Sequence, residues 1–341
     1  MHLTLLVPEL IWPEPGDTLT LGKLALPGIE WLLGRSTLQT LPRQPYESTL
    51  AGCFPQSSHN LATLRRHGEN STPDMAGPWL CADPVHLRFH HERIVLADAG
   101  AFDLDATEAA ALVDALNAHF ADIGTLHAVT PRRWYLHLAH AVDHRAAPLS
   151  AVAGRRMDSE LDDKTTPLYR WLNEVQMVLH THPVNEARQQ RGLPAVNSLW
   201  LWGETQPAGE HTAPATVWSD DPLAIGLARH AGSRIHPRPS SLADVLADGA
   251  ATPLVLLDQL QGPVWYEDSS GWRDAWHALD ADWFQPLRGQ LGKSVKKLDL
   301  IAPTLYGQLH VTASGRSGWQ FWKKPRRLAD LAATLAQDTP S

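Results

Sequence analysis

The sequence has little cysteine: Cys53 and Cys81 are the only two in 341 residues, and they lie far apart. A disulfide-stabilised scaffold is thereby excluded, and reduced thiols in a reducing compartment are expected. No stretch approaches the ~18 consecutive apolar residues of a membrane span. The N-terminal segment lacks a cationic region and a cleavage site, and Pro8 and Pro13 interrupt its apolar run, so no signal peptide is predicted. We therefore expect a cytoplasmic protein with no membrane partner.

Basic residues are also in deficit, with 29 Lys and Arg against 37 Asp and Glu and a net charge of −8. Binding to nucleic-acid phosphates needs clustered basic side chains, so a nucleic-acid partner is not expected. The one basic cluster, "KKPRR" at residues 323–327, is predicted to be solvated. Metal-binding C-x-x-C and H-E-x-x-H motifs, the G-x-S-x-G nucleophile motif, the P-loop and the dinucleotide-binding glycine motif are all missing.

What the sequence does contain is a large apolar fraction, 43%, in a chain long enough for two domains or for one large α/β domain with an insertion. Short apolar runs such as "HLTLLVP", "SLWLWG", "TPLVLLD" and "KKLDLIAP" predict buried strands. In the C-terminal half these runs alternate with helical patterns, which indicates a largely parallel sheet. Residues 56–78 are polar and rich in Ser, Asn, Gly and Pro, and are predicted to form a surface connection.

The middle of the chain carries clear helix signals. Asp105 and Glu108 form a capping-box pattern before an apolar stripe, and the Thr-Pro pair at 166–167 opens a second helix. Pro183 is predicted to end that helix, and Asn185 to cap a short helix that stops at Gly192. Buried packing is expected for the two tryptophans of the strand that follows, Trp200 and Trp202.

The segment from 182 to 203 resembles a known family. Its "HPVN", a following Arg, "RGLP" and "VNSLWLWG" are similar, with matching gaps, to the signature of archaeal-type, cofactor-independent phosphoglycerate mutases of the alkaline phosphatase superfamily. Weaker similarity covers "LPGIEWLLGRS", "TLAGCFP" and "DLDATEAAALVDALNAHF". The segments "ADPVHL", "RRWYL" and "NEVQMVLHTHPVN" resemble a bacterial group labelled phosphoglycerate mutase or regulatory protein of the RpfE type.

The resemblance implies an α/β protein with an alkaline-phosphatase-like, mostly parallel sheet covered by helices. Residues 1–60 and 195–335 would form this discontinuous domain. A smaller α+β domain, residues 75–190, would be inserted between them. The segment at 182–203 would then be the joint that closes the insertion and returns the chain to the main sheet.

The resemblance also implies where catalytic residues should stand. Such mutases use two divalent metals, a nucleophilic serine and arginines that hold phosphoglycerate. Here Glu9 stands near the first Asp ligand without the Gly that should follow it, and Arg43 falls on the serine position. Asp258 keeps one carboxylate of a later motif, and Thr304, in "APT", stands where an Asp-His pair is expected. The resemblance therefore implies degenerate catalytic positions, with no metal and no cofactor.

Four further polar residues lie in segments shared with the bacterial group: Asp83, His86, Arg132 and Arg133. The two arginines could hold a phosphate or carboxylate group of a ligand. They could also pair with the surplus acidic residues, and this second interpretation is favoured.

Two functions remain open. The first is a catalytically degenerate regulatory or ligand-binding protein, whose partner is unknown and could be a phosphorylated or anionic metabolite or a regulatory protein. The second is a metal-dependent mutase or phosphatase with relocated ligands, which needs Glu9, Asp258, His180 and His182 to converge. Two histidines two positions apart diverge on a helix, so a structural role is favoured for that pair.

Overall fold

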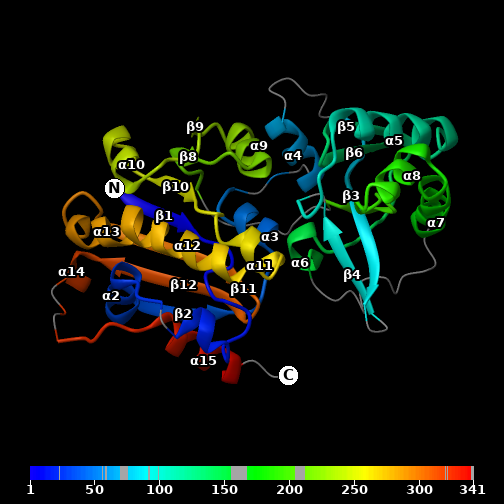
Figure 1. The fold of residues 1–341 in the computed structure, drawn as a ribbon. Helices are drawn as coiled ribbons and strands as arrows, with labels where there is room; N and C mark the ends of the chain where they lie inside the picture. Colours follow the sequence, from blue (N-terminus) through cyan, green and yellow to red (C-terminus); the bar gives the residue numbers. More distant parts are fainter. Residues whose placement is uncertain are drawn as a thin grey trace. The chain divides into compact units, whose positions relative to one another are not determined.

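The computed structural model divides the chain into two compact units, Met1–Gln56 with Gly209–Ser341 (unit 1) and Ser57–Ala208 (unit 2) (Figure 1). The first unit therefore consists of two chain segments, and the second is the stretch between them. The structure describes residues 1–22, 24–55, 57, 60–69, 76–90, 93–98, 100–154, 167–203, 212–318, 320 and 322–338.

Unit 1 is built on a seven-stranded sheet with the order β2-β12-β11-β1-β10-β8-β9. The five strands from β11 to β9 run parallel. At one side β12 pairs antiparallel with β11, and β2 pairs antiparallel with β12, so β2 runs in the direction of the five parallel strands. This mostly parallel α/β sheet confirms the fold class predicted from the alternating pattern. The strands are β1 (His2–Leu6), β2 (Thr37–Leu41), β8 (Thr216–Trp218), β9 (Arg234–His236), β10 (Pro253–Leu256), β11 (Lys297–Thr304) and β12 (Gly307–Ser314).

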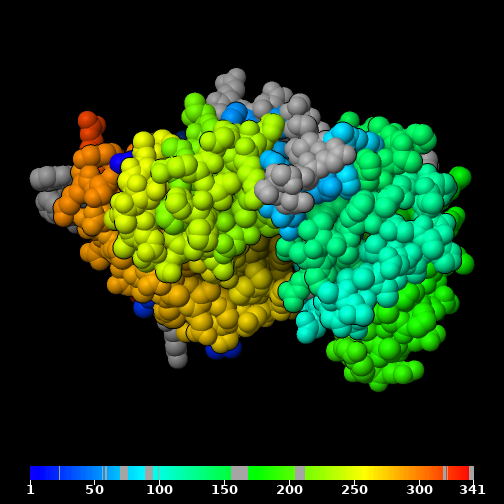
Figure 2. Space-filling model, turned by 90° about the horizontal axis from the view of Figure 1, so that it is seen from above, coloured from blue at the N-terminus to red at the C-terminus, as the bar shows by residue number. Residues whose placement is uncertain are grey.

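Helices cover this sheet, and a large apolar core joins β1, β11 and β12 to α2, α12, α13 and α15. Figure 2 shows the yellow-green residues of α9 and α10 at the surface of the unit. The helices are α1 (Thr18–Leu21), α2 (Pro27–Arg35), α3 (Tyr46–Ala51), α9 (Pro222–Ala231), α10 (Leu242–Asp248), α11 (Gln261–Trp265), α12 (Ser269–Leu279), the π-helix η1 (Asp280–Phe284), α13 (Gln285–Gln290), α14 (Gly315–Gly318) and α15 (Leu328–Asp338).

One buried carboxylate fastens α2 to η1. Asp280 accepts hydrogen bonds from the backbone N–H groups of Gly28 (3.1 Å) and Ile29 (2.7 Å), in the first turn of α2. The side-chain amide of Gln285 donates a third, at 2.9 Å. A negative charge at a helix N-terminus compensates the unsatisfied N–H groups there. This contact joins parts of the chain more than 250 residues apart.

Unit 2 contains a five-stranded antiparallel sheet in which β4, β3, β6 and β5 follow one another and β7 pairs with β3. One face packs against α5 and α7 through an apolar core. The capping box at α5 is confirmed, because both the Asp105 and the Glu108 hydrogen bonds are formed. The elements are α4 (Leu61–Glu69), β3 (Trp79–His90), β4 (Arg93–Asp98), α5 (Ala106–His119), β5 (Gly124–Thr130), β6 (Arg133–Leu138), α6 (Leu149–Val152), α7 (Pro167–His180), α8 (Pro183–Gln190) and β7 (Ser198–Trp202).

The expectation that 198–202 returns to the main sheet is wrong. Strand β7 pairs with β3 of unit 2, with Cys81 opposite Trp202 and Val85 opposite Ser198. The side chain of Asn197 extends this pairing, because its amide bonds both the N–H and the carbonyl of Leu87. The apolar pattern indicated a strand buried on both faces, which it is, but both sheets offer such a place. The wider division into a discontinuous domain and an insertion stays a prediction.

The prediction of a polar surface connection at 56–78 is wrong for residues 61–69, while residues 56, 58–59 and 70–75 lie outside the described part of the chain. Residues 61–69 form α4, and Asn60 caps it by accepting the N–H of Thr63 at 2.8 Å. Most of its first two turns are buried, including the charged Arg65. Composition indicated a loop because the segment is rich in Ser, Asn, Gly and Pro, and the burial of Arg65 depends on partners outside the segment.

No helix in the described part of the chain is long and apolar enough to cross a membrane.

Candidate functional site

The carboxyl ends of the parallel strands in unit 1 form the edge of the sheet at which the positions singled out by the resemblance lie. Strands β10, β1 and β11 are adjacent, and Glu9, Asp258 and Thr304 follow or end them. In open α/β sheets this edge is the usual ligand-binding edge. Arg43 follows β2 at the same edge and is exposed.

Glu9 is held by its backbone in an unusual conformation. Its φ is 56°, in the left-handed region that residues other than glycine rarely adopt. Its N–H donates to the carbonyl of Pro303 (2.9 Å), and its carbonyl accepts the indole N–H of Trp272 (3.3 Å). The side chain is 6% exposed. A strained, buried carboxylate at this edge is the feature that most resembles a functional residue.

Asp258 is neutralised by a cation. Its Oδ1 accepts a hydrogen bond from Nη1 of Arg238 at 2.7 Å, and the guanidinium also lies 3.8 Å from Asp220. Arg238 follows β9, the edge strand beyond β8, so the ion pair forms across this end of the sheet. The sequence gave no sign of the pairing, because the two residues approach only through strand order.

The Thr304 side chain stabilises the turn between β11 and β12. Its hydroxyl donates to the carbonyl of Gly307 (2.8 Å) and accepts the N–H of Tyr306 (3.2 Å), which closes the connection from β11 to β12. Gly307 has φ 143°, and a Cβ there would lie 2.8 Å from the carbonyl oxygen of Leu41. The hydroxyl is therefore committed to a tight turn rather than to a ligand.

A residue that the sequence did not single out, Tyr46, lies in the same region at the start of α3. Burial raises its pKa well above the ordinary value, and the negative charges of Asp221, Asp258 and Glu47 raise it further. Tyr46 therefore stays protonated and can only act as a neutral hydrogen-bonding group. The surroundings are acidic, which does not favour binding an anion at this point.

The metals that the family resemblance implies do not fit these residues. Within the described ranges, no group of three or more His, Cys, Asp or Glu side chains is arranged to hold a metal ion. Of the two retained carboxylates, Asp258 is paired with Arg238. A divalent-metal site needs several converging oxygen or nitrogen ligands, so we derive no chemical step through a metal.

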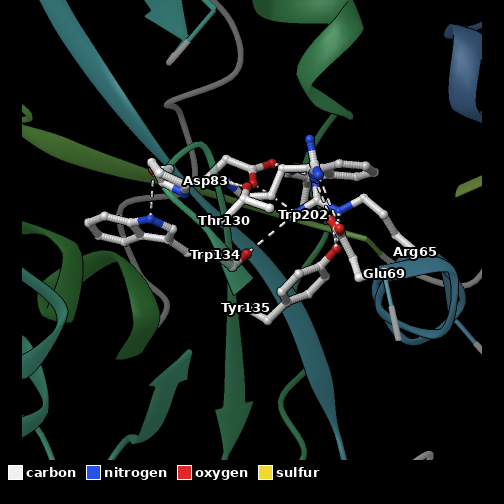
Figure 3. Close-up of polar contacts among 9 residues, drawn as sticks. Arg65, Glu69, Asp83, Thr130, Trp134, Tyr135 and Trp202 are labelled. Carbon is white, nitrogen blue, oxygen red and sulfur yellow. Dashed lines mark hydrogen bonds and ion pairs between the residues drawn. The ribbon is translucent and has the colours of Figure 1, made fainter. Parts of the chain in front are cut away.

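A second polar cluster lies in unit 2, where α4 covers one face of the sheet (Figure 3). The guanidinium of Arg65 makes a two-pronged ion pair with Asp83, at 2.7 and 2.8 Å. Both side chains are almost completely buried. Burial lowers the pKa of Arg65, but the charge and hydrogen bond of Asp83 raise it more, so the guanidinium stays protonated.

The network continues through a tyrosine to a second ion pair. The hydroxyl of Tyr135 accepts from Nε of Arg65 (2.9 Å) and donates to Glu69 (3.1 Å). Glu69 in turn accepts two hydrogen bonds from Arg133. Two arginines thus balance two carboxylates, and the favoured pairing of Arg133 with an acidic residue is what the structure has.

Aromatic rings complete this environment. The indole N–H of Trp202 donates to Asp83 at 2.8 Å, and the Arg65 guanidinium lies 5.0 Å from that ring and 4.6 Å from the Tyr135 ring. Trp202 and Trp200 are buried, as predicted. Because both oxygens of Asp83 are engaged, this cluster fastens α4 to the sheet.

The remaining candidates lie elsewhere in unit 2. Among the described residues, the ion-pair contact of Arg132 is a long one, 3.7 Å, with the exposed Asp103. His86 on β3 bonds the carbonyl of Ala195 through Nδ1, at 2.8 Å. The four candidates therefore do not converge on one site. Asp83 and Arg133 belong to one network, and Arg132 and His86 make separate contacts.

The prediction that Asn185 caps the short helix is wrong. The cap of α8 is His182, whose Nδ1 accepts the N–H of Val184 (3.2 Å), and Pro183 is the first helical residue. Asn185 is 1% exposed and bonds the carbonyls of Leu179 and Val196 and the N–H of Val196. It fastens the end of α7 to the segment before β7.

No family model matches the chain, and no curated protein matches it. Two solved structures are similar over nearly its full length. The cofactor-independent phosphoglycerate mutase from Thermoplasma acidophilum is 16% identical, covering 97% of this chain and 95% of its own, with a TM-score of 0.44. The PH0037 protein from Pyrococcus horikoshii is 13% identical, covering 97% and 91%, with a TM-score of 0.54. At such identities, the likeness to the Pyrococcus protein shows a common fold and nothing about activity.

Proposed function

We propose that this chain is a catalytically degenerate relative of the cofactor-independent phosphoglycerate mutases, with an alkaline-phosphatase-like scaffold and a regulatory or ligand-binding role. The resemblance of the segment 182–203 to the mutase signature supports the ancestry. The side chains at the sheet edge of unit 1 support the loss of catalysis.

The observation that carries the proposal is the ion pair between Asp258 and Arg238, 2.7 Å apart. A carboxylate that binds a metal needs its negative charge, and a guanidinium in contact with it competes for that charge. Thr304 is committed to its turn, and Arg43 offers a guanidinium where a nucleophile is needed. A guanidinium is always protonated and cannot attack phosphorus.

The alternative is an active mutase or phosphatase with relocated ligands. It needs His180 and His182 as ligands beside Glu9 and Asp258. His182 already uses Nδ1 to cap α8, and His180 is exposed at the end of α7. The structure offers these histidines no shared partner among the described residues, so the alternative has less support.

The test is a phosphoglycerate mutase and phosphatase assay of the purified chain with manganese. We expect no turnover above the background without protein. Asp258→Asn is the companion variant, because it removes one of the two carboxylates, Glu9 and Asp258, that stand near the ligand positions of the family.

Manganese-stimulated turnover that follows the protein through purification and disappears in Asp258→Asn would contradict the proposal. Turnover that Asp258→Asn leaves unchanged would point to a contaminating enzyme and would leave the proposal standing.

A further inference from the structure

The strand β2 (Thr37–Leu41) forms one border of the seven-stranded sheet of unit 1, beside β12 (Figure 1). In the described part of the chain, β12 is its only strand partner, and the two strands pair over all five residues of β2. Four of these five residues are exposed, and Leu38 is half-buried. The strand therefore has an open edge on the side away from β12.

The register shows which backbone groups of β2 point to this open edge. In an antiparallel pair, successive residues direct their N–H and C=O groups alternately toward the partner strand and away from it. The carbonyl oxygen of Leu41 points toward β12, because it lies 2.8 Å from the position that a Cβ on Gly307 would take. The alternation then places the N–H and C=O groups of Leu38 and Thr40 on the open side. The ladder with β12 leaves these four groups to water or to another strand.

The sequence of β2 lacks the features that usually protect an open sheet edge. The strand reads Thr-Leu-Gln-Thr-Leu, without a charged residue or a proline, and its register with β12 is unbroken. Two other edge strands differ from it. Strand β9, at the opposite border of the same sheet, has three residues and begins with Arg234. Strand β5 of unit 2 has an irregularity between Ala128 and Thr130. The edge of β2 is thus suited to pairing with another strand.

We infer that β2 is a dimerisation edge, at which two copies of this chain pair antiparallel and join their seven-stranded sheets into one. A second copy is the partner because the strand is complementary to itself. With Gln39 opposite Gln39 of the second copy, Leu38 lies opposite Thr40 in both directions, and the four open groups of each strand bond those of the other. Thr37 then lies opposite Leu41. Within β2, no like charges meet across the two-fold axis.

The neighbouring residues select this register. A shift by one residue would bring the open groups of one strand opposite groups that already point toward β12. A shift by two residues in one direction brings Leu38 opposite Pro42, which has no N–H group. The same shift in the other direction brings Thr40 opposite Ser36, which lies outside β2 at the end of α2. The register centred on Gln39 is the one that uses all four open groups within the strand.

The size of the contact predicts a weak dimer. Stable interfaces bury about 800 Å² on each partner, and two paired strands of this length bury less. Association should therefore depend on protein concentration. Sedimentation velocity of the whole chain measures it, and we expect monomer to dominate at about 10 µM and dimer to increase toward about 1 mM.

The residue at the centre of the pairing, Gln39, gives the most specific variants. Gln39→Lys places two positive side chains opposite each other, with Cβ atoms about 4.5–5.5 Å apart, and should weaken dimerisation about tenfold or more. Gln39→Glu should weaken it similarly. An equimolar mixture of the two variants should restore the dimer, because opposite charges then meet. Gln39 is exposed, so both variants should melt at the wild-type temperature.

The matched control is Thr125→Lys, which adds the same charge at an exposed position on the edge strand β5 and should leave dimerisation unchanged.

The inference is overturned if the wild-type chain stays monomeric up to about 1 mM, as it would if the edge received an extended segment of another protein or of the same chain. It is also overturned if the Gln39→Lys variant dimerises as well as wild type, or if the mixture of Gln39→Lys and Gln39→Glu associates no better than either variant alone. The mutase assay has no bearing on these results, so the inference and the proposed function fail separately.

Discussion

Among single residues, the buried ion pair of Arg65 and Asp83 has the largest consequences for unit 2. Two charges removed from water are tolerated only when they are paired and their hydrogen-bonding groups are occupied. Here Asp83 occupies two guanidinium nitrogens, Tyr135 takes the third, and Trp202 donates to the carboxylate. Removing one partner should therefore cost far more than the pair itself contributes.

Asp83→Ala should lower the free energy of unfolding of unit 2 by about 3–5 kcal/mol, because it leaves the Arg65 guanidinium buried without a counter-charge. Urea denaturation followed by circular dichroism measures the change. The control is Asp103→Ala, which removes the partner of the long, exposed contact with Arg132 and should have no measurable effect. Equal stability of the two variants would mean that Arg65 finds water or another acid when Asp83 is lost.

At the scale of elements, α8 shows what the residues of the "HPVN" segment do in the structure. His182 caps the helix, while Asn185, inside its first turn, links α7 to the segment that leads into β7. Two residues of one "HPVN" motif thus have different structural tasks. The motif is an architectural joint in this chain, now within unit 2 rather than between two sheets.

Asn185→Ala should destabilise the protein more than His182→Ala. The first removes three hydrogen bonds between the buried Asn185 amide and the backbone of Leu179 and Val196 and should cost roughly 3 kcal/mol, whereas losing a helix cap costs about 1 kcal/mol. Thermal unfolding of the two variants at neutral pH measures the difference. A larger loss in His182→Ala would mean that the cap, and not the amide link, holds α8 in place.

The same pair of variants has a pH signature. Burial lowers the pKa of His182, so the unfolded chain takes up its proton first. A histidine whose pKa is lowered on folding decreases the free energy of unfolding as the pH falls below the pKa of the unfolded state, about 6.5. The His182→Ala variant should therefore lose less stability on acidification than Asn185→Ala does.

At the scale of the molecule, each of the two units has an apolar core and a buried aspartate that fastens a helix. Asp280 fastens α2 to η1 in unit 1, and Asp83 fastens α4 to the sheet in unit 2. If the units are domains with separate cooperative unfolding, calorimetry should show two transitions. Asp280→Ala should lower one of them and Asp83→Ala the other. A single transition lowered by both variants would mean that the chain unfolds as one body.

Local patterns predicted several elements well. The apolar runs of β1, β10 and β11 and the capping box of α5 lie where the sequence places them, because each signal is contained within a few neighbouring residues. The alternation of helices and strands predicted the parallel part of the unit 1 sheet for the same reason. The helix α4 was missed, because the segment around it is rich in Ser, Asn, Gly and Pro and the burial of Arg65 depends on distant partners.

The candidate sites were predicted less completely than the elements. The family resemblance singled out Glu9, Asp258 and Thr304, but Arg238 and Tyr46 were not foreseen, since the resemblance assigned neither of them a role. In unit 2, Asp83 was chosen as a candidate while Arg65, which neutralises it, was not. The partner of a charged group decides whether it is free for a ligand, and that partner is a property of the packed structure.

The sequence by itself determined the class of fold and the start and end of the strongly patterned elements. These properties depend on side-chain identity and on periodicity over one or two turns of chain. Only the tertiary structure decided that β7 belongs to the sheet of β3, that His182 and not Asn185 caps α8, and that Arg238 holds Asp258. In each case the local sequence fits more than one partner equally well, and contacts between residues far apart in the chain decide which partner is used.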